Sequence, residues 1–390
     1  MKMISNLNKS MIEEILSEIQ ISESKYEEAE RRYNAIGEWL NRDESMVAKF
    51  SPKIYAQGSF LFGTAIKPTT MRDEYDVDIV SELEISKFTI SQSALKEMIG
   101  KEIKAYAESQ NMDHKPSEGK RCWTLIYADG TKFHIDVLPA VPDNRLLLEF
   151  KNDVRVHTSW LETAIAITDR THKNFDKITQ DWPVSNPKGY FQWFKEQMVV
   201  QFEEKSRALF EAYQGEVEEM PFYKVRTPLQ NVIQLLKYHR DVLFENYSEN
   251  KPISIIITTL AAHVYNNEAD LVDALINISA KMRNFVEKDQ YGNWEIINPV
   301  NPKENFTDKW VDNPNLENAF FKWLDRVEED FSFENLTKES EPLFESFQQS
   351  FGVGIAAKAL EKVASRKQSP ISKPSPKVDI SPRKPWTNKF

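Results

Sequence analysis

The sequence has one cysteine in 390 residues, Cys122, so neither an internal disulfide nor a cysteine-rich metal site can form. This scarcity fits a reducing cytoplasm, and we expect Cys122 to be a small apolar residue of a strand rather than a nucleophile. Long apolar runs are missing too, since none approaches the roughly 20 residues that span a bilayer. The N-terminal MKMISNLNKSMIEEI also lacks the apolar core of a signal peptide. We therefore expect a cytoplasmic protein without a membrane partner.

A surplus of positive charge is also missing, because the formal net charge is −10 at pH 7. A protein that follows a long nucleic acid needs a broad cationic surface, so we expect no long nucleic-acid partner. A local cationic pocket for one small anion remains compatible with this balance. The GxxxxGK[ST] pattern is absent, which argues against P-loop chemistry. With 41% hydrophobic and 28% charged residues, the chain has the composition of a globular protein and the length for two packed units.

The first half of the chain has the pattern of a mixed sheet covered by helices. KIYAQ and EYDVDIV are predicted strands, and a helix is expected over about 91–108. CWTLIYA and TKFHIDVLPAV are two further strands, joined as a hairpin by Asp129-Gly130, a dipeptide that suits a turn with positive φ. An earlier helix is predicted with Ser24 and Glu27 as its capping box and with one apolar face, made of Tyr26, Ala29, Tyr33, Ile36 and Leu40.

The second half, from about residue 187, has an almost wholly helical pattern. TPLQNVIQLLKYHRDVL begins with Thr227 as N-cap, Pro228 at the first helical position and Gln230 closing a capping box. NKPISIIITTLAAHVY predicts a second buried helix, and NPVNPKENFTDKW is predicted to be a loop. Past about residue 368, five prolines without apolar periodicity predict a disordered tail. We expect an α+β protein with a catalytic lobe over 1–185, a helical lobe over 186–352, and a helix end with a tail over 353–390.

Three acidic residues form the strongest candidate site. Strand side chains alternate, so Asp76 and Asp78 lie on one face of EYDVDIV, and Asp136 lies opposite Ile135 and Val137 in KFHIDVL. If the two strands are neighbours, three carboxylates converge and need a cation between them. Oxygen-only ligation suits Mg²⁺, and two such ions can activate a hydroxyl and stabilise a leaving pyrophosphate. The alternative is a set of surface acids on an edge strand, which the apolar flanks of these residues disfavour.

Gly58-Ser59 ends a strand and is expected to begin a short helix. Glycine lets the backbone approach a phosphate, serine adds a hydroxyl donor, and a helix N-terminus favours negative charge. Gly-Ser alone is a common turn. The ordered combination of Gly-Ser, Asp-x-Asp and a later strand aspartate is more specific than any of its parts.

This combination, in GSFLFGT, DEYDVDIV and HIDVLPAV, resembles the signature of polymerase-β-type nucleotidyltransferases. With TPLQNVIQLLKYHRD, KPISIIITTLAA and NPVNPKENF, the pattern over about 55–310 resembles the bacterial cGAS-like (CD-NTase) family of CBASS anti-phage signalling. The resemblance implies a polymerase-β-like core with a helical lobe, and a synthase that joins nucleoside triphosphates, ATP among them, into a cyclic oligonucleotide. A downstream effector would then be reached through the product only.

Matched residue by residue, the resemblance assigns Asp76, Asp78 and Asp136 to catalysis and to two Mg²⁺ ions. It assigns four residues to the donor triphosphate: Gly58, Ser59, Lys237 and Ser254. For Lys237 a solvated helix face, and for Ser254 a plain serine in a helical first turn, remain open alternatives. His134, His239 and His263 show no metal-ligand spacing on one face, and structural roles are expected for them.

Other functions remain open on the sequence alone. A second class is a nucleotidyltransferase that tails RNA or modifies a protein hydroxyl, although RNA tailing would favour a basic groove with stacking aromatics. A third class is a catalytically silent scaffold that binds nucleotides or partners. In some members of the resembled family, a ubiquitin-transfer-like enzyme conjugates the C-terminus, and we expect the same use of Phe390. Unchanged in-cell signalling after removal of the last few residues would contradict that expectation.

Overall fold

The structure is a computed structural model that describes residues 4–68, 75–127, 133–154, 156–212, 222–246, 248–338 and 340–368. Asp73, the Asp129-Gly130 turn and the predicted tail with Phe390 lie outside these ranges. No described helix is both long and apolar enough to cross a membrane.

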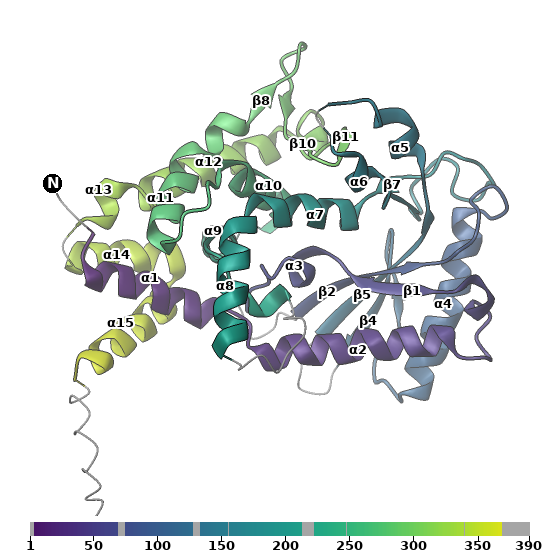
Figure 1. The fold of residues 1–390 in the computed structure, drawn as a ribbon, viewed down its shortest axis with the longest axis horizontal. Helices are drawn as coiled ribbons and strands as arrows, with labels where there is room; N and C mark the ends of the chain where they lie inside the picture. Colours follow the sequence, from purple (N-terminus) through teal and green to yellow (C-terminus); the bar gives the residue numbers. More distant parts are fainter. Residues whose placement is uncertain are drawn as a thin grey trace, which may run out of the picture.

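One mixed sheet organises the first half of the chain (Figure 1). Within the described residues its main path runs β1-β2-β5-β4-β3, and β6 pairs with both β5 and β7. β2 and β5 are parallel, and the other pairs are antiparallel. The strands are β1 (Lys53–Ala56), β2 (Tyr75–Glu82), β3 (Ser117–Glu118), β4 (Trp123–Tyr127), β5 (Phe133–Pro142), β6 (Ile165–Ile167) and β7 (Val184–Ser185). This arrangement confirms the predicted α+β class and places β2 and β5 inside the sheet.

Two long helices cover one face of this sheet, namely α2 (Glu23–Asn41) and α4 (Gln92–Ser109) (Figure 1). Their apolar sides share a core with the buried Val77 and Ile79 of β2. The helix predicted over about 91–108 is confirmed as α4. The capping box predicted at Ser24 and Glu27 is wrong, because the N-cap is Ser22, two residues earlier, and Ser24 is already helical. Short elements complete this half: α3 (Gly58–Leu61), α5 (Arg145–Phe150), α6 (Thr158–Leu161) and the 3-10 turn η1 (Ala48–Phe50).

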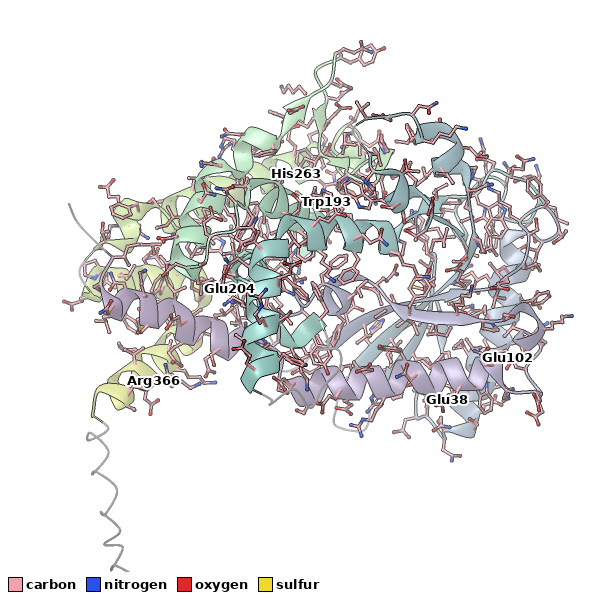
Figure 2. All side chains as sticks on the ribbon, viewed as in Figure 1. Glu38, Glu102, Trp193, Glu204, His263 and Arg366 are labelled. Atoms are coloured by element: carbon pink, nitrogen blue, oxygen red, sulfur yellow. The ribbon has the colours of Figure 1, made fainter. Side chains whose placement is uncertain are left out.

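A second core lies among the helices of the other half. Its central helix, α9 (Pro228–Leu243), has the predicted Thr227 and Gln230 capping box. The N-terminal α1 (Asn6–Ile19) also packs into this core, against α15 and α9. The remaining helices are α7 (Pro187–Gln197), α8 (Val199–Ala212), α10 (Ser254–Val264), α11 (Leu271–Lys281), α12 (Pro314–Asp330), α13 (Phe333–Leu336), α14 (Ser340–Phe351) and α15 (Val353–Gln368), with the 3-10 turns η2 (Phe222–Lys224), η3 (Ser248–Asn250), η4 (Met282–Phe285) and η5 (Asp308–Trp310). Figure 2 shows the side chains that fill this region.

The segment predicted as an Asn/Pro-rich loop contains a hairpin instead. β10 (Ile297–Asn298) pairs antiparallel with β11 (Asn301–Asn305), and β8 (Glu287–Lys288) pairs with β9 (Trp294–Glu295) nearby. The loop prediction was therefore wrong. Asn305 explains the difference, since its side chain accepts a hydrogen bond from the backbone of Ile296 and donates one to the carbonyl of Trp294. The side-chain amide of Asn305 thus makes hydrogen bonds with the backbone that help to hold the hairpin, and residue propensities do not take such bonds into account.

One face of α9 ties the two halves together. Gln230 Nε2 donates to the carbonyl of Phe62 at 2.9 Å, Gln234 Nε2 to that of Ala65 at 2.8 Å, and Lys237 Nζ to that of Thr64 at 3.0 Å. The three donors recur at helical spacing, so they lie along one side of α9. The segment that follows α3 is thereby fixed against the helical core.

Candidate active site

The three predicted carboxylates meet on adjacent strands. Asp78 of β2 lies directly opposite Asp136 of β5 in the parallel register, and Asp76 lies two residues before Asp78 on the same face. Both strands are internal, so the alternative of surface acids on an edge strand is wrong. Among the described residues, a carboxylate oxygen of Asp76, one of Asp136 and a ring nitrogen of His134 lie within 4.8 Å of one another.

These carboxyl groups do not ionise alike. Burial, together with the charges of Asp76 and Asp136, raises the pKa of Asp78 to about 7. Burial and the charge of Asp136 also raise the pKa of Asp76. Although burial opposes it, hydrogen bonds from His134, Thr124 and Cys122 hold the pKa of Asp136 below its usual value. Crowded oxygens that resist full ionisation are a donor set suited to a hard divalent cation.

The sequence analysis expected a structural role for His134 and did not place it beside the three aspartates. Its Nε2 lies 3.1 Å from Asp136 Oδ1, so it contacts one of the expected metal-binding carboxylates. The signal was present in the sequence, because residues two apart on a strand share a face. Cys122 lies just before β4 and not within a strand, so that part of its prediction was wrong. Burial and the neighbouring Asp136 raise the pKa of its thiol to about 12 and leave it protonated, which agrees with the expectation that it is no nucleophile.

Two features of the backbone at position 58, which lies beside Asp78, favour glycine there. The φ of Gly58, +63°, is a left-handed conformation that residues with a Cβ rarely adopt. A Cβ at this position would also lie 2.8 Å from Asp78 Oδ2. The preceding Gln57 donates its backbone N–H to the carbonyl of Asp78 at 2.9 Å, which fixes the turn to β2. The predicted short helix beginning at Gly58-Ser59 is confirmed as α3.

Lys237 and Ser254 reach the same region from the helical half. Lys237 is 6% exposed, so the alternative of a solvated helix face is wrong. Burial and then the charge of Arg240 lower the pKa of its ammonium to about 8. Ser254 is the first residue of α10, and its Oγ accepts a hydrogen bond from Arg240 at 2.9 Å. The first-turn position predicted for Ser254 is therefore correct.

A cavity of about 630 Å³ brings most of the predicted residues together. Three cationic side chains that the sequence analysis did not single out also line it, namely Lys67, Arg240 and Lys251. Lys251 pairs with Asp241 at 2.9 Å, and Arg240 pairs with the same carboxylate at 2.7 Å. The predicted residues along its wall are Gly58, Ser59, Asp76, Asp78, Lys237 and Ser254. A carboxylate group beside a cation-lined hollow can bind a polyanion together with divalent metal ions.

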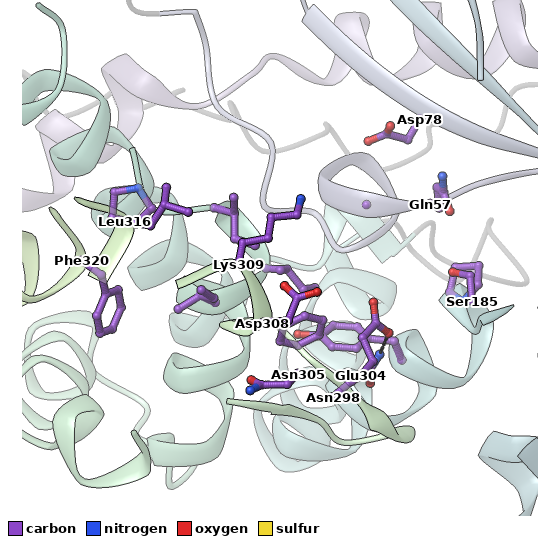
Figure 3. Close-up of a pocket in the computed structure, with 18 of the residues that line it drawn as sticks. Gln57, Asp78, Ser185, Asn298, Glu304, Asn305, Asp308, Lys309, Leu316 and Phe320 are labelled. Atoms are coloured by element: carbon purple, nitrogen blue, oxygen red, sulfur yellow. Dashed lines mark hydrogen bonds between the residues drawn. The ribbon is translucent and has the colours of Figure 1, made fainter. Parts of the chain in front are cut away.

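A second cavity, of about 430 Å³, adjoins the first and shares Gly58, Asp78 and Lys251 with it. Its wall combines aromatic and amide side chains with acids, among them Tyr190, Asn298 and Glu304. Figure 3 shows Asp78 and Gln57 in one part of this cavity and Asn298, Glu304 and Asn305 in another. Apolar walls with a few placed polar groups are typical of small-molecule sites.

Comparison with known proteins adds to this geometry. Residues 7–165 match the family model described as "Second Messenger Oligonucleotide or Dinucleotide Synthetase domain". A protein of Roseivirga ehrenbergii named c-di-GMP synthase is 29% identical over 333 residues, which cover 83% of this chain and 80% of that protein. A cyclic dinucleotide synthase, CdnG of Bradyrhizobium diazoefficiens, is 23% identical over 81% of this chain and 73% of its own length.

Solved structures agree on the fold. The CD-NTase CdnG of Bradyrhizobium diazoefficiens in complex with GTP matches with a TM-score of 0.69 at 20% identity, over 93% of this chain and 100% of that one. The Vibrio cholerae dinucleotide cyclase DncV, as a mutant in complex with ATP, GTP and 5MTHFGLU2, matches with a TM-score of 0.60 at 14% identity, over 92% and 99%. Residues 7–165 are therefore similar to a second-messenger synthetase domain, and the chain shares its fold with solved CD-NTase structures.

Proposed function

We propose that the protein joins nucleoside triphosphates into a cyclic oligonucleotide second messenger, in anti-phage defence. A ribose hydroxyl attacks the α-phosphate of a bound triphosphate, and pyrophosphate leaves. The observation that carries this proposal is the carboxylate group of β2 and β5 beside a cation-lined cavity. The names of the relatives support it, since one is called c-di-GMP synthase and another cyclic dinucleotide synthase, and the solved structures of CdnG and DncV described above both hold GTP.

Asp76, Asp78 and Asp136 would hold the metal, for which we propose two Mg²⁺ ions. The fit rests on the chemistry of these oxygens, because desolvation and then mutual repulsion raise the pKa values of Asp76 and Asp78, and a cation relieves the repulsion. Bound Mg²⁺ would supply activation of the hydroxyl and stabilisation of the departing pyrophosphate. His134 would position Asp136 through its ring nitrogen.

The chain's own groups have separable tasks in this proposal. Lys237 offers a point charge to the triphosphate, while Ser59 and Ser254 line the same cavity with hydroxyl groups. Asp136, whose pKa is low, is ionised at neutral pH and can accept the hydroxyl proton. The adjoining cavity gives room for a second nucleotide, and a second attack after the linear product turns round would close the ring.

The rival classes predict different products. RNA tailing or protein nucleotidylation would place label from a triphosphate on a macromolecule, and a silent scaffold would give no turnover. The intact carboxylate group argues against the scaffold, and the net charge of −10 argues against a long RNA substrate. Incubation with labelled triphosphates and Mg²⁺, followed by phosphatase treatment, separates the classes, because a cyclic product has no terminal phosphate to remove.

The proposal also includes the location of the protein and a partner enzyme. The proposed location is the bacterial cytoplasm, which the single cysteine suits. A ubiquitin-transfer-like enzyme that conjugates Phe390 stays a prediction, because that residue lies outside the described ranges.

Replacing Asp78 separates metal binding from folding. We expect Asp78→Asn to lower turnover about 10³-fold or more, because a buried metal-binding charge is lost. Its melting temperature without divalent cations should stay equal or rise, because the change removes repulsion among three close carboxyls. The control is Asp113→Asn, which alters an exposed acid. Retained turnover in Asp78→Asn would contradict the proposed role.

Two glycines with positive φ provide a matched pair. Gly58→Ala should strain the backbone by about 1–2 kcal/mol and press a methyl group against Asp78. We expect a fall in turnover of about 10²-fold, since a displaced carboxylate misplaces the reacting groups. At Gly292 the φ is +86°, but an added Cβ would meet nothing within 4 Å. Gly292→Ala should therefore strain the backbone to a similar extent and keep the turnover. Equal turnover in the two variants would rule out a positional role for Gly58.

Lys237→Met tests the phosphate contact through its pH dependence. The variant should raise KM for the triphosphate about 10- to 100-fold, as expected for one lost charge-assisted hydrogen bond. In the wild type, the ammonium loses its proton as the pH rises through about 8, so triphosphate binding should weaken above that pH. That pH-dependent limb should vanish in Lys237→Met and persist in the control Lys101→Met, an exposed lysine paired with Glu97. An unchanged KM would assign Lys237 to holding Thr64 alone.

A further inference from the structure

The second cavity ends in a carboxylate that the proposed chemistry does not use. Glu304 belongs to β11 and lines this cavity, and its Oε2 accepts a hydrogen bond of 2.7 Å from Asn298 Nδ2. Asn298 is itself buried in β10, so the carboxylate is held by a fixed partner. Figure 3 shows the pair in the part of the cavity away from Asp78. A phosphate would be repelled here, so this part of the cavity suits an uncharged group of the nucleotide.

A guanidinium group stands near this carboxylate. Arg121 lines the same cavity, and its side chain is about half exposed. Its Nε donates to Asp169 at 2.9 Å, and a guanidinium carries five N–H donors in all. The side chain of Glu304 is open to the cavity. Partial desolvation by the cavity wall raises its pKa, and the hydrogen bond from Asn298, the charge of Arg121 and a hydrogen bond from Asn301 only partly oppose this rise. The carboxylate therefore gains from further N–H donors brought by a ligand.

We propose that Glu304, with Arg121 beside it, recognises the Watson–Crick edge of a guanine base and makes the enzyme select GTP. This inference rests on the proposed function and deepens it by naming the substrate class. Guanine places two donors, N1–H and N2–H₂, next to one acceptor, O6. The two donors match a carboxylate, and the acceptor matches a guanidinium N–H. Because each carboxylate oxygen has two lone pairs, the hydrogen bond from Asn298 leaves capacity for the base.

The other bases do not present this pattern. Adenine turns the lone pair of N1 toward the position of the carboxylate beside its single amino group. Cytosine follows its amino group with two acceptors, and uracil flanks its single N–H with two. A carboxylate that faces a lone pair meets repulsion and loses the hydrogen bonds that guanine would donate, so this site disfavours the other bases. Selection therefore depends on the charge of Glu304 and not on cavity volume.

The test compares GTP with ATP and with inosine triphosphate, which differs from GTP only by lacking the 2-amino group. The full chain is given equimolar pairs with Mg²⁺, and incorporation into phosphatase-resistant product is measured by mass. The wild type should prefer GTP in both pairs. Glu304→Gln keeps the shape and an acceptor for Asn298, but it should lower the GTP-to-ATP ratio about 10- to 100-fold. It should also bring the ratio of GTP to inosine triphosphate close to one.

Asp312→Asn is the matched control, since it removes the same charge from a nearby exposed acid that lines neither cavity and should leave the base ratios unchanged. A wild type that prefers another base, or unchanged ratios in Glu304→Gln, would overturn this inference while leaving the synthase function intact. Absence of any cyclic product from the wild type would instead overturn the proposed function. Equilibrium binding of GTP and inosine triphosphate to both forms measures the same selectivity without turnover, and equal losses for the two ligands would count against Glu304.

Discussion

Everything at the active site depends on three hydrogen bonds from one face of α9 to the chain that follows α3. Gln230, Gln234 and Lys237 hold the carbonyls of Phe62, Ala65 and Thr64, so the Gly58-Ser59 turn cannot shift relative to the helical core. The side-chain oxygen of Gln230, Oε1, accepts the capping hydrogen bond from the backbone N–H of Thr227. Its side-chain nitrogen, Nε2, donates to the carbonyl of Phe62. Lys237 is both a member of this row and part of the cavity wall, so the same side chain that joins the two halves also faces the proposed binding site.

A second constraint acts against the first. Packing brings Asp76, Asp78 and Asp136 together at a cost, since burial and like charge disfavour their ionised forms. Hydrogen bonds from Thr124 and His134 relieve this for Asp136 alone. The fold thus favours the ionised form of Asp136 and disfavours the ionised forms of Asp76 and Asp78. Placing these carboxylates together lowers the stability of the folded protein, as is common where a site is arranged to bind a ligand.

Much of this site followed from local rules in the sequence. The common face of Asp76 and Asp78 results from strand alternation, and the capping box of α9 involves residues only three apart. Features that depend on distant partners were harder to predict. Lys237 is buried because it meets Thr64, 173 positions away along the chain, and periodicity carries no such information. The hairpin at β10 and β11 was missed because a segment rich in Asn and Pro is typical of a loop, and the side-chain hydrogen bonds by which Asn305 holds the hairpin cannot be seen in composition.

The residues proposed for bond formation and those proposed for base recognition lie on different parts of the chain. The carboxylates lie on β2 and β5, whereas Glu304 and Asn298 stand on a short excursion of the helical half, more than 150 residues later in the sequence. Substitutions in that excursion would leave the bond-forming apparatus untouched. Under the proposed role of Glu304, exchanges at a few hairpin positions would change which nucleotide is chosen and leave the carboxylates of β2 and β5 unaltered.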